Sequence, residues 1–311
     1  MVSPGPATSP GAPGDRPPLV LSAFRTDALG ERVRAALGGE PGQVHLRRFP
    51  DDETHVRLGT DPRGREVVVV CDLHHPDAKT VSLALLCATA RDLGARRVGV
   101  VAPYMPYMRQ DARFKPLEGV TSRYYGALLS GMVDWLVTVD PHLHRHATLD
   151  EVISVPHRVV SAAGRVAEWV KAAVPDPLLV GPDAESAQWA ERVAGLAGAP
   201  HVVLEKVRKG DHEVELTVPD LERWRGRTPV LVDDIVSTGT TLIETLGHVR
   251  RAGLRPAACV VIHALFSGGA WQRLEAARPS RLVTCNAVPH LTNAIDLSAP
   301  IAAAVRELLA P

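Results

Sequence analysis

Short apolar runs alternate with amphipathic segments along most of the chain. Residues 67–71 are four valines and a cysteine, a run typical of a strand that is buried on both faces of a parallel sheet. Residues 79–93 carry small and apolar side chains at helical spacing, and Gly94 follows where such a helix would end. The same pattern predicts further strands at residues 19–23, 44–49, 54–58, 98–102, 136–139, 178–180, 202–204, 230–232, 258–265 and 281–285. Repeated strand–helix alternation predicts an α/β fold of mostly parallel sheets with helices on both faces.

The alternation runs through two halves of similar length, which predicts two α/β domains. A chain of 311 residues with 45% hydrophobic residues has room for two domains of about 150 residues each. Residues 1–17 are rich in proline, glycine and alanine, and we expect them to be a disordered leader. We expect domains at residues 18–154 and 155–290. The last segment, 291–311, ends in a predicted helix and is expected to pack back on the N-terminal domain.

Charge and hydropathy argue against two classes of partner. Thirty-five basic residues balance thirty-five acidic ones, so no nucleic-acid partner is expected. No apolar run in the sequence reaches the roughly 18 residues that a membrane span needs, so no membrane partner is expected either. The four cysteines are widely spaced and form no CxxC pair, so we expect them to be reduced and mostly buried in a cytoplasmic protein.

The most informative stretch is VLVDDIVSTGTTL, at residues 230–242. An apolar strand ends in two aspartates, and a turn rich in hydroxyl groups then opens a predicted helix at residues 242–251. The free N–H groups and the dipole at a helix start favour an anion. Two ionised carboxylates can accept hydrogen bonds from neighbouring sugar hydroxyls or hold a cation. The stretch therefore predicts a site for a sugar 5-phosphate, formed by Asp233, Asp234, Ser237, Thr238, Gly239, Thr240 and Thr241.

An ordinary capped helix after a buried strand is the alternative for this stretch. Serine and threonine cap helices in many proteins, so the turn alone does not distinguish the two interpretations. Two consecutive aspartates at the end of an apolar strand favour a functional site, because burying unpaired carboxylates is costly.

A long segment, residues 103–122, follows the strand predicted at 98–102. Loops of this length after a strand are often functional. Arg109, Gln110 and Asp111 offer charged and amide groups suited to a polyphosphate or a purine ring. The alternative for this segment is a solvated basic loop.

Three histidines at a spacing of two follow an aspartate in residues 140–146. Imidazole and carboxylate groups both bind divalent cations and phosphates. Pro141 argues against a regular strand, in which alternate side chains would share one face. The pattern therefore predicts one functional histidine rather than a three-histidine zinc site.

A second basic cluster, Lys206, Arg208 and Lys209, directly follows the strand predicted at 202–204. Alternating residues then predict one arm of a hairpin. Such a flap could cover bound phosphates, or it could be an ordinary exposed hairpin, and the residues alone leave both open.

The stretch at 233–241 resembles the phosphoribosyl-diphosphate binding loop shared by type I phosphoribosyltransferases and ribose-phosphate diphosphokinases. Both families have two acidic residues, a few variable ones and then Thr-Gly-x-Thr. The segments RRFPDDETHV, PYMPYMRQDARFKPLEGVTS, TVDPH, GPD and EKVRK extend the resemblance to the diphosphokinases over residues 19–311. This implies two type I phosphoribosyltransferase-like domains, and the Arg-Phe-Lys-Pro-x-Glu segment is closer to the archaeal-type enzymes. A single-domain phosphoribosyltransferase would have no reason to carry the segments in the first half.

The resemblance implies a role for several side chains. Lys206 and Arg208 would be the catalytic cations, and His142 and Asp183 would meet a magnesium ion (Mg2+), the implied cofactor. The 233–241 loop would bind ribose 5-phosphate. ATP would contact Phe49, Asp51, Glu53, Arg109, Gln110, Asp111 and His142.

The chain departs from the family pattern in the loop that should receive a diphosphate. The family usually has two glycines and a following arginine there, whereas this chain has Ala184, Glu185 and Ser186. Glu185 adds a negative charge, and the missing glycines reduce close access to the backbone. Pro141 also replaces the usual apolar residue before His142.

The implied reaction is transfer of the diphosphoryl group of ATP to ribose 5-phosphate, giving 5-phosphoribosyl 1-diphosphate and AMP. The resemblance also implies a homo-oligomer, at least a dimer, in which the adenine-contacting segment reaches a neighbouring site. Two alternatives remain open. One is a non-catalytic regulatory homologue that binds nucleotide and associates with an active synthetase, and the other is a related transferase that uses another sugar phosphate.

Overall fold

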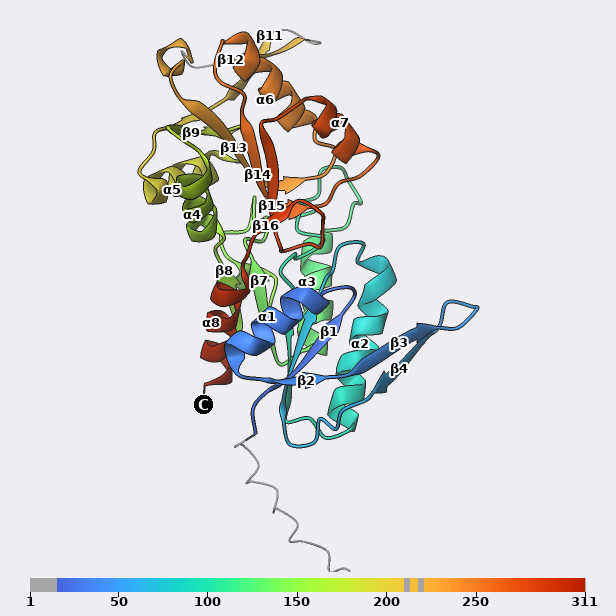
Figure 1. The fold of residues 1–311 in the computed structure, drawn as a ribbon. Coiled ribbons are helices and arrows are strands. Elements are labelled where there is room, and N and C mark those ends of the chain that lie inside the picture. The colour runs from blue at the N-terminus through green and yellow to red at the C-terminus, as the bar shows by residue number, and fades with distance from the viewer. Residues whose placement is uncertain (1–15, 210–212, 218–220, 311) are drawn as a thin grey trace, which may run out of the picture.

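The computed structural model describes residues 16–209, 213–217 and 221–310, and the side chains of residues 205–220 and of Glu222 lie outside that description. The fold is built around two six-stranded parallel sheets (Figure 1). The leader predicted at 1–17 lies outside the described residues except for its last two. The prediction of an α/β fold with mostly parallel sheets is confirmed.

The first sheet has the strand order β2-β1-β5-β6-β7-β8. Its strands are β1 (Leu19–Ala23), β2 (Glu40–Gly42), β5 (Glu66–Cys71), β6 (Arg97–Val101), β7 (Trp135–Val139) and β8 (His157–Val160). The helices that connect them are α1 (Asp27–Leu37), α2 (Asp77–Asp92) and α3 (Thr121–Met132), with a short 3-10 turn at Leu149–Glu151. All six residues of β5 are buried, as its unbroken apolar run requires in the centre of a parallel sheet.

The second sheet has the order β10-β9-β13-β14-β15-β16. Its strands are β9 (Pro177–Gly181), β10 (His201–Val203), β13 (Thr228–Val236), β14 (Ala258–Ala264), β15 (Arg281–Cys285) and β16 (Asn293–Ile295). Its helices are α4 (Ala163–Ala173), α5 (Ala187–Ala197), α6 (Thr240–Arg251) and α7 (Ala270–Ala276), with a 3-10 turn at Glu222–Trp224. Two antiparallel hairpins stand apart from the sheets: β3 (Val44–Arg48) with β4 (Thr54–Leu58), and β11 (Glu205–Lys209) with β12 (Glu213–Thr217).

Each sheet extends past the domain boundary that the sequence pattern predicted, the first past residue 154 and the second past residue 290. β8 pairs with β7, so the first sheet continues to Val160, and β16 pairs with β15, so the second continues to Ile295. Both added strands are short edge strands with exposed positions, which leave no apolar run to detect. The last helix, α8 (Ser298–Leu309), packs against α1, β7 and β8 of the first sheet.

One apolar core runs through both domains. Val137 of β7, Val166 of α4 and Ile301 of α8 belong to the same buried cluster, which therefore joins the sheets through α4 and α8. Separate clusters fill the opposite faces, under α2 and α3 in the first domain and under α6 and α7 in the second. A shared core of this size favours one fixed arrangement of the two domains.

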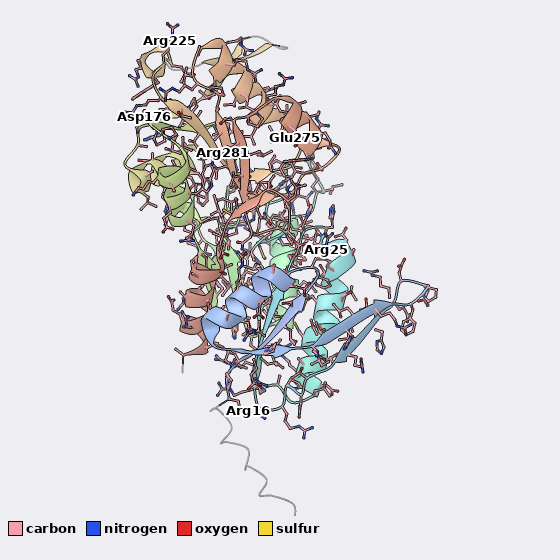
Figure 2. The ribbon with its side chains drawn as sticks, in the orientation of Figure 1. Arg16, Arg25, Asp176, Arg225, Glu275 and Arg281 are labelled. Carbon is pink, nitrogen blue, oxygen red and sulfur yellow. The ribbon has the colours of Figure 1, made fainter. Side chains whose placement is uncertain are left out.

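The carboxyl ends of the two sheets face each other across the junction between the domains. In Figure 2, Arg16 and Asp176, which precede β1 and β9, lie toward opposite outer ends of the molecule, whereas Arg25, which follows β1, lies toward the junction. Ligands of open parallel sheets bind beyond the carboxyl ends of the strands. The fold therefore brings two such edges to one place.

The cysteines and the possible membrane-spanning helices can be compared with the expectations from the sequence. All four cysteines are described, and each is buried with a free thiol. Across the described ranges, no helix has both the length and the apolar character needed to cross a bilayer.

Two glycines of α3 provide a test of the packing between this helix and the loop after the Leu149–Glu151 turn. A β-carbon at Gly126 would overlap the carbonyl oxygen of Val152, whereas one at Gly131 meets nothing within 4 Å. We expect Gly126→Ala to destabilise the protein by about 1–3 kcal/mol through overpacking. Gly131→Ala, the matched control, should stabilise it by up to about 1 kcal/mol through helix propensity. Urea unfolding of both variants would measure this, and equal effects at the two positions would contradict it.

Candidate active site

The loop after β13 has an open helix start. β13 continues through both aspartates to Val236, beyond the strand predicted at 230–232, and α6 begins at Thr240 rather than at Leu242. Gly239 precedes the helix with φ of +75°, a conformation that glycine adopts without steric cost. Within the part of the chain that the structure describes, no side chain caps the start of α6. Its first N–H groups are therefore available to an anion, which weakens the alternative of an ordinary capped helix.

A cavity of about 420 Å3 lies beside this loop, between the carboxyl ends of the two sheets. The predicted residues that line it come from β13, the start of α6 and the loops after β6, β7, β9 and β13, and they are Arg109, Asp111, His142, Asp183, Asp233, Asp234, Ser237, Thr238, Gly239, Thr240 and Thr241. Phe114, His144, Arg145 and Glu185 also line it. No role was expected for Phe114 or Arg145 from the sequence, although both lie in segments with candidate functional residues.

A hydrogen bond crosses the cavity from one domain to the other. His142 Nδ1 lies 2.7 Å from Asp234 Oδ2, and both side chains are largely buried. The bond raises the pKa of His142 and, against the effect of burial, holds the pKa of Asp234 below its ordinary value. With Nδ1 occupied by Asp234, Nε2 is the nitrogen left for a phosphate oxygen or a metal ion.

Among the described residues, Asp233 has no comparable basic partner. Burial raises its pKa well above the ordinary value, and the nearby charges of Asp234 and Asp183 raise it further. Its Oδ1 accepts the backbone N–H of Asp234. A cation placed among these three carboxylates would relieve their mutual repulsion, so the acidic group suits a divalent ion. Among the described residues, no cluster of three or more His, Cys, Asp or Glu side chains forms a complete metal site, so substrate or water oxygens would have to complete the coordination.

Asp111 holds the loop after β7 in place. Its buried carboxylate accepts a hydrogen bond from the guanidinium of Arg145 at 2.9 Å and another from the Arg145 backbone N–H at 3.0 Å. These bonds lower the pKa of Asp111 although burial acts in the opposite direction. The guanidinium of Arg145 also lies 5.1 Å from the ring centre of Phe114. The contact of Asp111 is thus with a basic residue of the cavity.

The loop after β9, which departs from the family pattern, bonds its backbone N–H groups to its own side chains. Asp183 Oδ1 accepts the N–H groups of Glu185 and Ser186, each at 3.1 Å, and Ser186 Oγ accepts the N–H of Asp183. Glu185 does not stand alone in the cavity, because its carboxylate lies 3.1 Å from His144 Nε2. The extra negative charge is therefore placed against a histidine from the other domain.

Four predicted ATP residues do not line the cavity. Phe49, Asp51 and Glu53 lie at the tip of the β3–β4 hairpin, which projects away from the first sheet (Figure 1). Phe49 is 38% exposed, and Arg47 covers one face of its ring. Gln110 is next to the cavity residues in sequence, but its side-chain oxygen accepts the hydroxyl of Thr121 at the start of α3.

The two predicted catalytic cations lie on β11. In the hairpin, Lys206 is opposite Leu216 and Arg208 is opposite Val214. Their side chains lie outside the described part of the structure, so their position relative to the cavity stays a prediction.

Comparisons with known proteins agree with this arrangement. Residues 19–132 match the family described as the N-terminal domain of ribose phosphate pyrophosphokinase, and residues 157–298 match the phosphoribosyl transferase domain. The ribose-phosphate pyrophosphokinase of Methanopyrus kandleri is 34% identical over 292 residues, which cover 93% of this chain and 99% of that protein. That of Methanothermobacter thermautotrophicus is 30% identical over 290 residues, which cover 93% and 100%. The crystal structure of phosphoribosylpyrophosphate synthetase from Mycobacterium smegmatis has the same fold, with a TM-score of 0.81 at 23% identity over 94% of this chain and 98% of that one.

The fold and the site define a two-domain protein of the phosphoribosyltransferase type, with the 233–241 loop on one domain and a basic and histidine-bearing edge on the other. On the strength of the near full-length relatives, the chain belongs to the ribose-phosphate pyrophosphokinase family, the diphosphokinases of the sequence resemblance. The resemblance to the diphosphokinases, and to their archaeal-type members in particular, is confirmed.

The contact between His144 and Glu185 can be tested by its effect on diphosphate binding at the loop after β9. Replacing the histidine in His144→Gln removes the imidazole that the Glu185 carboxylate contacts, so affinity for inorganic diphosphate should fall by roughly two- to tenfold, the range of one hydrogen bond. Adding Glu185→Gln removes that charge and should restore the affinity. Isothermal titration with diphosphate would measure both variants. A double variant no better than His144→Gln would contradict the compensation.

Proposed function

We propose that this protein transfers the diphosphoryl group of ATP to the anomeric hydroxyl of ribose 5-phosphate, giving 5-phosphoribosyl 1-diphosphate and AMP. The observation that carries the proposal is the hydrogen bond between His142 and Asp234 inside the cavity. It joins a nucleotide-side residue of the first domain to a sugar-side residue of the second. Near full-length relatives named ribose-phosphate pyrophosphokinase support it.

The second domain supplies the sugar-phosphate half of the site. The hydroxyl groups of residues 237–241 and the open N-terminus of α6 suit the 5-phosphate. Asp233 and Asp234 suit two neighbouring ribose hydroxyls, because carboxylate oxygens accept their hydrogen bonds.

The first domain supplies the nucleotide half. Arg109 lines the cavity with an exposed guanidinium, and Arg145 enters it from the next loop. Both suit phosphate oxygens, as does His142 through Nε2. We propose that Asp111 contributes by holding Arg145, since its carboxylate already accepts two hydrogen bonds from that residue.

In the reaction, the anomeric oxygen attacks the β-phosphorus while the bond from that phosphorus to the oxygen of the α-phosphate breaks. The sugar hydroxyl loses its proton, and AMP leaves. Positioning and charge stabilisation dominate such a transfer, because the protein forms no bond to the phosphoryl group. Mg2+ would be held by Asp183 and His142 together with phosphate oxygens, where it would neutralise developing charge.

We propose that the β11–β12 hairpin brings Lys206 and Arg208 over the transferring group. Cations that meet charge only as it develops in the transition state raise the rate without tightening substrate binding. By analogy with loss of one oxyanion donor, each would contribute roughly 3–4 kcal/mol.

The first experiment is an assay for AMP release with ATP, Mg2+ and ribose 5-phosphate. Wild-type protein should release AMP only when the sugar is present, and Lys206→Ala should lower kcat by about a hundredfold or more. Lys171→Ala, an exposed position on α4, is the matched control and should leave the rate unchanged. A Lys206→Ala variant as active as the control would sink the assignment of Lys206.

The alternatives predict different outcomes of the same assay. A regulatory homologue would bind nucleotide without releasing AMP. A transferase for another sugar phosphate would release AMP only with a different pentose phosphate. Full-length similarity to diphosphokinases favours neither alternative.

We also propose a cytoplasmic homo-oligomer. The β3–β4 hairpin carries its exposed Phe49 outside the cavity of its own chain, and a neighbouring copy is the partner whose cavity it could complete. Four buried free thiols support a reducing compartment.

Light scattering tests the assembly. The mass in solution should be at least twice the chain mass of 33.4 kDa. Deleting the tip of the β3–β4 hairpin should weaken ATP use. It should leave ribose 5-phosphate binding intact, because the 233–241 loop lies in the second domain. A single species of 33.4 kDa at assay concentrations would contradict the oligomer.

A further inference from the structure

Two neighbouring strands of the second domain hold the loop that follows β7 of the first. Asp234 on β13 contacts His142, and His263 on β14 contacts the backbone where that loop begins. β13 and β14 are paired in parallel with Ile235 opposite His263, so the two contacts come from adjacent places on one sheet edge. One edge therefore holds the loop at two points.

His263 is bonded to two backbone carbonyl groups of the other domain. Its Nε2 lies 3.1 Å from the carbonyl oxygen of Val139 and 3.3 Å from that of Asp140. Both partners are acceptors, so Nε2 must carry a proton and donate to them. The side chain is 1% exposed, and burial lowers the pKa of His263, which favours the neutral ring with its single proton on Nε2.

Only Nε2 of the His263 ring makes hydrogen bonds within the described residues. Nδ1 of His263 is buried and has no hydrogen-bond partner among the residues that the structure describes. The ring lies beside Tyr104, with 5.3 Å between ring centres. The polar contacts of this histidine are therefore all directed at the end of β7.

Asp140 is the residue on which these contacts converge. Its backbone carbonyl accepts His263, and its side chain accepts the N–H of Ala162 at the start of α4, at 2.6 Å. It adopts φ of +35°, in the left-handed region that non-glycine residues seldom occupy. Surrounding contacts must hold such a conformation, and here they come from both domains, because the N–H of Asp140 also donates to the carbonyl of Val160 on β8 at 3.0 Å.

The conformation at Asp140 sets where His142 lies. Only Pro141 separates the two residues, and proline restricts the backbone on both sides of it. A backbone that relaxed at Asp140 would move His142 away from Asp234. A displacement of about 1 Å at a catalytic group can cost on the order of a hundredfold in rate.

We propose that His263 is a positioning residue for the reaction: its hydrogen bonds to Val139 and Asp140 fix the strained turn after β7 and so place His142 of the first domain against the sugar-binding edge of the second. The inference rests on the proposed function. His263 does not line the cavity, so it would act through the turn after β7.

The test compares two replacements of different chemistry. His263→Gln keeps an amide N–H that can donate to the same carbonyl groups, whereas His263→Leu keeps apolar volume and removes the donor. His201→Leu, at an exposed histidine on β10 of the same sheet, is the control. Steady-state kinetics would give kcat and KM, and titration calorimetry would give Kd for ribose 5-phosphate and for a non-hydrolysable ATP analogue with Mg2+.

We expect His263→Leu to lower kcat by about ten- to a hundredfold and to weaken the ATP analogue. Its Kd for ribose 5-phosphate should stay within about twofold of wild type, because the hydrogen bonds that it loses are to Val139 and Asp140 and not to the 233–241 loop. His263→Gln should keep most of the activity. This combination distinguishes positioning from general destabilisation, which would weaken the sugar and the nucleotide together.

Three outcomes would overturn the inference: unchanged kcat in His263→Leu, equal losses in His263→Gln and His263→Leu, or a parallel loss of sugar affinity. If His263→Leu does not fold, the Gln variant decides, since a folded protein with more than about a tenfold loss of kcat would refute rescue by a retained donor. If the wild type releases no AMP, the proposed function fails alone. The analogue affinities of the variants relative to wild type would still test the junction.

Discussion

The site exists because the carboxyl ends of two parallel sheets meet, and the contacts at the end of β7 hold them in register. Asp140 adopts a strained left-handed conformation that costs about 1–3 kcal/mol. Three hydrogen bonds hold this residue, from His263 to its carbonyl group, from Ala162 to its carboxylate and from its own N–H to the carbonyl of Val160, each contributing about 1 kcal/mol. The strain and its support nearly balance. The turn is therefore stable only while both domains are in place, which ties the position of His142 to the junction itself.

Electrostatics makes the same region costly in the absence of a ligand. Burial raises the pKa of Asp140 to about 7 and that of Asp233 well above its ordinary value, whereas His142 lets Asp234 stay ionised. In the proposed reaction, sugar hydroxyls and a divalent ion would satisfy Asp233, which lines the cavity. The cost of burying this carboxylate would then be offset on binding, a common trade at active sites.

Local patterns predicted the fold class and the sugar-phosphate loop, because a buried strand, a turn and a helix start are encoded within a dozen residues. They could not give the contact between His142 and Asp234, which lie 92 positions apart. Nor could they show that β8 joins the first sheet, since its four residues carry no apolar run. The resemblance named His142 as a nucleotide residue but said nothing of its sugar-side partner. Such pairings depend on how the two sheets dock, which periodicity does not record.

The loop after β9 differs from the family pattern, and its internal hydrogen bonds limit how it could bind a diphosphate. In a phosphate-binding loop, free backbone N–H groups face the anion. Here Asp183 accepts the N–H groups of Glu185 and Ser186, so these donors are already occupied. The anion must then depend more on cationic side chains, and the chain places Arg109, Arg145 and His142 around the same cavity. Charged side chains attract phosphate over a longer range than backbone N–H groups do, so they constrain the position of the anion less. Discrimination in this protein should therefore come from the sugar loop and the domain junction rather than from the diphosphate loop.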